Sequence, residues 1–142
     1  MSGTEKATEK ATENASETGT EPGTARVQPG AADALSGQLQ RTELQRSPSS
    51  IEGRVIVQVL TEIPAGVESG WHTHPGEEVG YIVEGIVEMR RRGEPTLLLH
   101  AGDGFLIPPR MPHNARDVGP GVGRMLSTYI VEEHEPLSSF TG

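Results

Sequence analysis

The 142-residue chain contains no cysteine, so it can form no disulfide and can offer no thiolate to a metal or a substrate. Aromatic residues are scarce, at 4% of the sequence, which weakens the case for a site built from stacked rings, as in sugar recognition. Apolar residues make up 33%, and no apolar run approaches the ~18 residues of a membrane-spanning helix. We therefore expect no membrane partner. The first residues lack the apolar core of a signal peptide, so the cytoplasm is the expected location.

Positive charge is also scarce. The formal net charge is −8, and residues 51–142 contain thirteen acidic residues, seven arginines and no lysine. Proteins that bind nucleic acids need basic surfaces to neutralise phosphate, so we expect no nucleic-acid partner. The one basic cluster, Arg90-Arg91-Arg92, lies at the expected end of a strand, and we interpret it as the solvent-exposed tip of a hairpin.

Residues 1–48 differ in composition from the rest of the chain. A four-residue unit repeats in Thr4-Glu-Lys-Ala-Thr8-Glu-Lys-Ala-Thr12-Glu, and sequence rich in Gly, Pro and Ser follows. Because large apolar residues are too few to offset chain entropy, we expect residues 1–48 to form a disordered low-complexity tail. A short helix around Ala31–Gln45 is the one element that the spacing of leucines suggests there. The tail either docks a partner or is a dispensable extension, and the second interpretation is favoured.

A single domain is expected over residues 49–142, where short segments rich in β-branched residues alternate with Gly- and Pro-containing turns. Strands are predicted over residues 54–63, 71–83, 86–91, 96–100, 105–107 and 123–132. No segment in this interval shows a sustained helical period. Six to eight short strands separated in this way predict an all-β, antiparallel barrel or sandwich.

Two imidazoles and a carboxylate lie close together in this domain. His72, His74 and Glu78 are all even-numbered, so one face of one extended strand can present all three side chains inward, whereas Glu77 faces away. A fourth candidate, His113, follows the second glycine-bounded strand. Imidazole nitrogens together with a carboxylate oxygen suit a divalent first-row transition metal.

The spacing resembles the first sequence signature of the cupin superfamily, matched at Gly66, His72, His74, Glu78 and Gly85. The second signature of that family is matched at Gly102, Pro108 and His113, whereas Arg110 stands where a glycine is usual and Asp117 where an asparagine is usual. The resemblance covers roughly residues 50–135. It implies a double-stranded β-helix, the jelly-roll or cupin barrel. It also implies a homodimer formed by an added edge strand, for which residues 54–62 are the expected donor.

We expect four residues to bind one divalent metal inside this barrel: His72, His74, Glu78 and His113. The carboxylate favours Fe or Mn, and Ni, Co, Cu and Zn are further candidates. Apolar and aromatic residues of the neighbouring strands are the candidates for a substrate pocket: Tyr81, Met89, Phe105, Ile107, Met125 and Tyr129. His100 is expected outside the barrel and His134 in solvent.

Three functions are consistent with such a site. The first is a mononuclear metal-dependent oxygenase, of dioxygenase type, acting on a small organic substrate. The second is a metal-assisted isomerase or lyase that uses the ion as a Lewis acid on a carbonyl or hydroxy compound. The third is a non-catalytic module that binds or senses a small molecule, because a fold alone does not imply a function. The three-histidine, one-glutamate set resembles the oxygenase branch of the family, so an oxidoreductase is the favoured expectation.

Overall fold

The computed structural model describes residues 33–141, which contain one short 3-10 helix and ten strands. The elements are η1 (Ala34–Gly37), β1 (Gln40–Pro48), β2 (Arg54–Ile63), β3 (His72–Thr73), β4 (Gly76–Glu84), β5 (Ile86–Arg91), β6 (Leu97–His100), β7 (Gly104–Ile107), β8 (His113–Asp117), β9 (Gly123–Glu132) and β10 (Ser139–Phe140). Among the described residues, no helix is long and apolar enough to cross a membrane.

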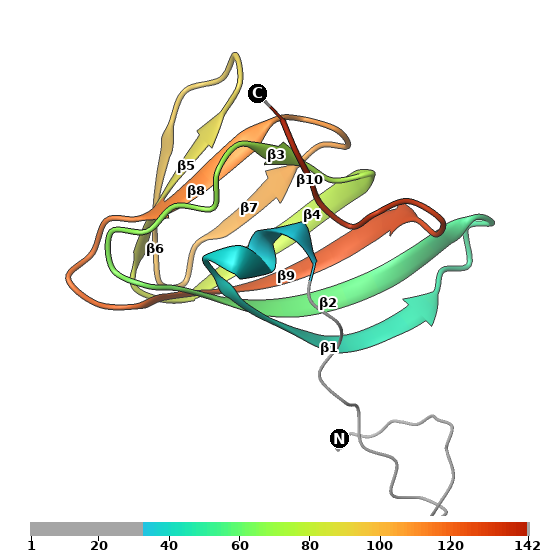
Figure 1. Ribbon diagram of the computed structural model, residues 1–142, viewed down its shortest axis with the longest axis horizontal. Coiled ribbons are helices and arrows are strands. Elements are labelled where there is room, and N and C mark those ends of the chain that lie inside the picture. The colour runs from blue at the N-terminus through green and yellow to red at the C-terminus, as the bar shows by residue number, and fades with distance from the viewer. Residues whose placement is uncertain (1–32, 142) are drawn as a thin grey trace, which may run out of the picture.

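The strands form two five-stranded antiparallel sheets that enclose the core (Figure 1). The first sheet has the order β1-β2-β9-β4-β7 and the second has the order β10-β3-β8-β5-β6. Strands that are neighbours in space are often distant in sequence, as where β9 pairs with both β2 and β4. The predicted all-β fold of the double-stranded β-helix type is confirmed.

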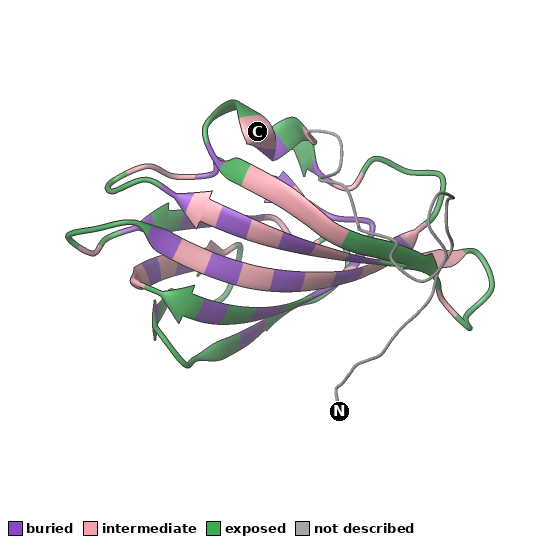
Figure 2. Cartoon of the chain, turned by 90° about the horizontal axis from the view of Figure 1, so that it is seen from below, coloured by how far each residue is buried: buried purple, intermediate pink, exposed green. Residues whose placement is uncertain are grey.

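Alternation along the strands places the core between the sheets. On β2 and β9, the odd-numbered residues are buried or half-buried and most of the even-numbered ones are half-exposed, which Figure 2 shows as stripes across neighbouring strands. A period of two is what a strand with one face on a core requires. The buried apolar residues form a larger cluster around Ile63, Ile82 and Met89 and a smaller one of Val57, Val59, Tyr129 and Val131.

The prediction of a disordered tail through residue 48 is wrong for residues 33–48, while residues 1–32 lie outside the described part of the chain. Leu35 and Leu39 are buried in the larger core cluster, at 3% and 4% exposure. The strand β1 pairs with β2 along nearly its whole length. Of the suggested helix around Ala31–Gln45, only the single turn of η1 is helical. β1 is difficult to predict from the sequence because its inward positions are polar. Arg41 and Glu43 lie opposite β2 residues that face the core.

The docking of β1 also changes the expected mode of dimer formation. Because β2 pairs with β1 on one side and with β9 on the other, residues 54–62 have no free edge to offer a second copy. The predicted pairing of two chains through that strand is therefore wrong. A homodimer formed in another way stays a prediction.

Two glycines allow β4 to pack closely on both sides of Glu78. A Cβ atom at Gly76 would lie 1.9 Å from the carbonyl oxygen of Ile130, and one at Gly80 would lie 2.0 Å from the ring of Phe105. Any side chain at either position would push β4 away from its neighbours. The inward-pointing Glu78 is thus held between two positions where only glycine fits.

Candidate metal centre

Three buried histidines converge inside the barrel. His72 lies on β3 and pairs in register with His113 on β8, and His74 follows β3 directly. One ligand nitrogen from each of the three rings lies within 4.8 Å of the others. Their exposures are 3%, 2% and 1%, so water does not screen the site. Within residues 33–141, the three imidazoles that the sequence spacing singled out therefore lie together.

Backbone carbonyls fix the protonation pattern of all three rings. The Nδ1 atoms of His72, His74 and His113 lie 2.7, 2.8 and 2.9 Å from the carbonyl oxygens of Gly70, Leu137 and Met111. A carbonyl oxygen can only accept, so each Nδ1 carries the hydrogen and each neutral ring presents the Nε2 lone pair. Metal-binding histidines are held in the same way by partners of the second ring nitrogen.

Glu78 completes the cluster from β4. Its Oε1 lies 3.2 Å from Nε2 of both His74 and His113, and its Oε2 accepts hydrogen bonds from Ser127 at 2.7 Å and Tyr129 at 3.3 Å. Despite its distance to Oε1, Nε2 of His74 makes no hydrogen bond of good geometry. An oxygen that faces two nitrogen lone pairs in a buried site needs positive charge between them. The donor set therefore fits a metal cation.

The pKa shifts agree with this pattern. Burial, together with the neighbouring His113 and His74, lowers the pKa of His72 to about 3, so this ring is neutral at physiological pH. Burial alone would raise the pKa of Glu78, but positive charge at the neighbouring His113 and His74 outweighs burial and holds the pKa well below its usual range. A cation bound at Nε2 of these rings would supply the same positive charge. Burial and the charge of Glu78 raise the pKa of Tyr129 in spite of Arg41, so the Tyr129 hydroxyl keeps its proton.

The predicted pocket residues divide into three groups. Met89, Met125 and Tyr129 line a small internal void beside His72 and His113, with a volume of about 10 Å³. Phe105 and Ile107 are buried in the larger core cluster and do not line that void. The assignment of Tyr81 is wrong, because its side chain is 48% exposed. It is out of phase with Glu78 on β4 and points to the outer face. His100 is exposed, and the side chain of His134 is 90% exposed, as predicted for both.

The sequence analysis missed Arg41, which reaches the site from β1. Its side chain is 3% exposed and pairs with Asp33. It donates hydrogen bonds of 3.0 Å to the hydroxyl oxygens of Thr61 and Tyr129. Arg41 was not among the predicted site residues because residues 1–48 were predicted to form a disordered tail. The sequence signal for this segment was the spacing of Leu35, Leu39 and Leu44, of which the structure buries the first two.

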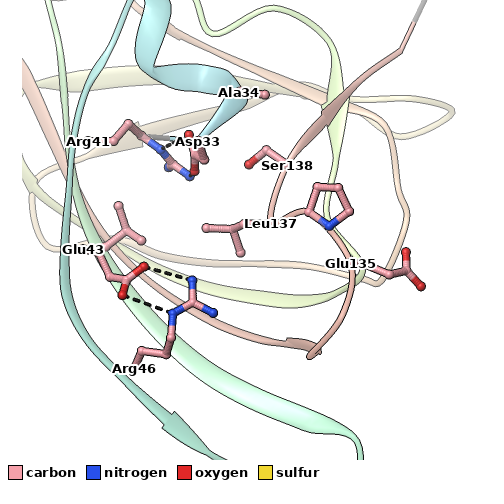
Figure 3. Close-up of a pocket in the computed structure, with 10 residues that line it drawn as sticks. Asp33, Ala34, Arg41, Glu43, Arg46, Glu135, Leu137 and Ser138 are labelled. Atoms are coloured by element: carbon pink, nitrogen blue, oxygen red, sulfur yellow. Dashed lines mark hydrogen bonds and ion pairs between the residues drawn. The ribbon is translucent and has the colours of Figure 1, made fainter. Parts of the chain in front are cut away.

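A cavity of about 380 Å³ lies between β1, η1 and the C-terminal segment of residues 135–138 (Figure 3). Arg41 lines both this cavity and the void beside the histidines. An ion pair between Glu43 and Arg46 forms one wall of the cavity, and the C-terminal residues Leu137 and Ser138 lie on the other side. The cavity thus approaches the histidine cluster, with Arg41 between them.

The two departures from the second signature have structural consequences. Arg110 adopts a φ of 61°, the left-handed region that favours glycine, and its exposed guanidinium pairs with Glu132 and Glu135. Asp117 is fully buried, and neither of its carboxylate oxygens has a hydrogen-bond partner within the described residues. Neither residue belongs to the histidine cluster.

Comparisons with known proteins agree with this architecture. The sequence model described as "Cupin domain" matches residues 59–129. The chain is 34% identical over 94 residues to the polyketide synthase CurC of Streptomyces cyaneus, covering 56% of this chain and 60% of CurC. It is 37% identical over 54 residues to the dimethylsulfoniopropionate lyase DddQ of Ruegeria pomeroyi, covering 38% of this chain and 27% of DddQ. The chain thus spans less than two thirds of each of these curated relatives.

Solved structures give the same picture. The crystal structure of DddQ from Ruegeria pomeroyi has a TM-score of 0.55 at 27% identity, covering 61% of this chain and 43% of that one. An RmlC-like cupin from Shewanella frigidimarina has a TM-score of 0.56 at 26% identity, covering 72% and 84%. The matched family region spans half of the sequence and includes all three histidines and Glu78. By its sequence match and its two-sheet barrel, the chain belongs to the cupin-domain family.

Proposed function

We propose that the chain binds one divalent first-row transition metal through His72, His74, Glu78 and His113, with Fe or Mn as the expected ion. The observation that carries the proposal is the common orientation of the imidazoles. Each Nδ1 is held by a backbone carbonyl, so the Nε2 lone pairs converge on one buried space. The Oε1 atom of Glu78 faces two of those nitrogens, and this mixture of imidazole and carboxylate donors suits Fe and Mn.

We further propose that the chain is an enzyme of lyase or isomerase type that acts on a small organic molecule. When bound, the metal would act as a Lewis acid toward an oxygen of the substrate. The chain would hold the ion in a buried space from which bulk water is excluded. The likeness to DddQ, whose name is that of a lyase, supports this class. The adjacent cavity of about 380 Å³ supports a small substrate, since ligand sites typically measure about 300–1,000 Å³.

A dioxygenase is the second candidate, and one feature of the site favours it. The combination of three histidines with one glutamate resembles the donor set of the oxygenase branch of the family. The two candidates differ in their need for dioxygen. A lyase or isomerase rearranges or divides the substrate without it, whereas a dioxygenase consumes it.

The test uses purified full-length protein, stripped of metal and reconstituted without oxygen with Fe(II) or Mn(II). It is then given hydroxy acids, diketones, catechols and flavonols, each with and without dioxygen. The proposal predicts turnover that is equal in the two atmospheres and that is lost in the His72→Ala variant. Turnover that requires dioxygen and consumes it would support the second candidate instead. Metal and compound binding without turnover in either atmosphere would contradict both and indicate a binding module.

A further inference from the structure

We propose that Arg41 is a positioning residue for the metal centre, which acts through Tyr129 to set the oxygen of Glu78 that faces the histidines. This inference rests on the proposed metal-binding function. It assigns a role to a residue of β1, a strand that lies outside the matched family region of residues 59–129. Two consecutive hydrogen bonds, from Arg41 to Tyr129 and from Tyr129 to Glu78, connect this residue to the cluster.

The first step is the fixed position of the guanidinium. Arg41 lies on β1 opposite Thr61 of β2, with its side chain 3% exposed. A buried cation is costly unless it is paired and hydrogen-bonded. Asp33 supplies the paired charge through both carboxylate oxygens, and it also accepts a hydrogen bond from the backbone N–H of Leu35 at the start of η1. The guanidinium is therefore held from the N-terminal side of the fold.

The second step is the orientation of the Tyr129 hydroxyl. Arginine can only donate hydrogen bonds, so the 3.0 Å contact makes the Tyr129 oxygen the acceptor. The proton of that hydroxyl must then be donated to another group. The acceptor is Oε2 of Glu78, at 3.3 Å. Arg41 thus directs the tyrosine proton toward the carboxylate.

The third step is that the two carboxylate oxygens of Glu78 make different contacts. Oε2 accepts from Tyr129 and also from Ser127, at 2.7 Å. Oε1 is the oxygen that faces the imidazoles of His74 and His113. Two hydroxyl donors on one oxygen favour a carboxylate that offers the metal only the other. We infer that without Arg41 the tyrosine proton is no longer directed, so Oε2 keeps only the hydrogen bond from Ser127 and can approach the metal more easily.

The experiment uses the full chain loaded with Co(II), whose visible absorption reports the number and type of its ligands. Arg41→Gln should change the Co(II) bands, with lower intensity as a second oxygen of Glu78 enters, and should weaken Co(II) binding by about 10–100-fold in competition with a chelator. Arg41→Lys should recover part of both effects. Tyr129→Phe should reproduce them, and the double variant should add little more, because the two residues act in one chain of contacts.

Arg124→Gln is the matched control. Arg124 lies on β9 like Tyr129 and pairs with Glu62 and Glu84, so its loss removes charge and ion pairs without touching the cluster. It should leave the Co(II) bands unchanged. Should Arg41→Gln fail to fold, Tyr129→Phe with wild-type bands would overturn the inference. Folded Arg41→Gln with wild-type bands and affinity would overturn it as well, while the metal function would stand. Wild-type protein that binds no Co(II) would overturn both.

Discussion

The centre of the chain and its two ends contribute to the candidate metal centre in different ways. The centre supplies the proposed donor groups, the three histidines and Glu78, from both sheets of the barrel. The ends supply contacts that orient groups around them: the Leu137 carbonyl holds the ring of His74, and Arg41 of β1 holds Tyr129. The two ends also face each other across one cavity (Figure 3).

The two regions should therefore respond to different changes. Donor chemistry depends on the identity of a few side chains, so single substitutions in the centre should remove it. The orienting contacts depend on whether the terminal segments stay docked, and one of them uses only a backbone oxygen. Deletion of a terminal segment should therefore disturb the orienting contacts more than any substitution at Leu137.

The largest effect is expected from the donors themselves. His72→Ala and Glu78→Ala should each reduce bound metal from about one ion per chain to near none. Folding should persist, since removal of one buried side chain costs about 1–5 kcal/mol and the core clusters remain. Elemental analysis of the purified variants measures their bound metal, and circular dichroism measures whether they fold. Asp103→Asn, on an exposed turn, is the control that should keep its metal. Full metal content in both donor variants would refute the proposed ligands.

A large effect on stability is expected from removal of the N-terminal segment. Deletion of residues 1–48 removes β1, Arg41 and the buried Leu35 and Leu39. Truncation of one buried leucine costs about 2–5 kcal/mol, so the free energy of unfolding should fall by more than about 4 kcal/mol in urea titrations. A chain that starts at Asp33 retains every described contact and should match the full chain. Equal stability of both truncated proteins would show that β1 adds nothing to the fold.

Acid should destabilise the metal-free protein. The pKa of His72 is about 3 in the folded state against an ordinary value of 6.5, so the unfolded chain binds more protons between these values and stability falls as pH decreases from 6.5 toward 3. At about 1.4 kcal/mol per pH unit, the full loss is at most about 5 kcal/mol. Glu78, whose pKa is lowered, adds to the loss below pH 4.5.

Urea titrations of metal-free protein at pH 7, 5 and 4 measure this loss. His72→Asn cannot titrate in this range, so its stability should fall less between pH 7 and pH 5 than that of the wild type. An identical fall in the two proteins would contradict the assigned role of His72.

The smallest effect concerns a buried carboxylate outside both regions. Asp117 has no hydrogen-bond partner within residues 33–141 for either oxygen, and a buried polar group without a partner is costly. Asp117→Ala, which removes both oxygens, should raise the free energy of unfolding by about 1–3 kcal/mol. It should leave metal content unchanged, because Asp117 is not in the cluster. A loss of stability in thermal unfolding would mean that the carboxylate has a partner.

The contrast between centre and ends also explains what the sequence could predict. The even spacing singled out His72, His74 and Glu78, but the single strand predicted over residues 71–83 is wrong. The chain breaks between β3 and β4, which belong to different sheets, and the three side chains meet inside the barrel instead of along one strand face. The period of two along β4 places Tyr81 on the outer face, where it lies, and its assignment to the pocket ignored that period. Strand order needed the family resemblance, since pairs such as β2 with β9 join residues far apart in sequence.

The orienting contacts could not be predicted in this way. The partner of His74 is the backbone oxygen of Leu137, and every residue carries such an atom, so no sequence pattern marks it. Arg41 faces inward from a strand whose inward positions are polar, which reverses the usual alternation. Its ion pair with Asp33 makes this burial tolerable, but the pairing appears only once η1 and β1 are folded against the barrel.

The most direct test of the account is anomalous X-ray diffraction from crystals of the full chain grown with Mn(II) or Fe(II). The proposed site predicts one anomalous peak per chain, bounded by the Nε2 atoms of His72, His74 and His113 and by Oε1 of Glu78. It further predicts that Oε2 of Glu78 remains bonded to Tyr129 and Ser127. A peak elsewhere, or no peak at saturating metal, would contradict the central claim.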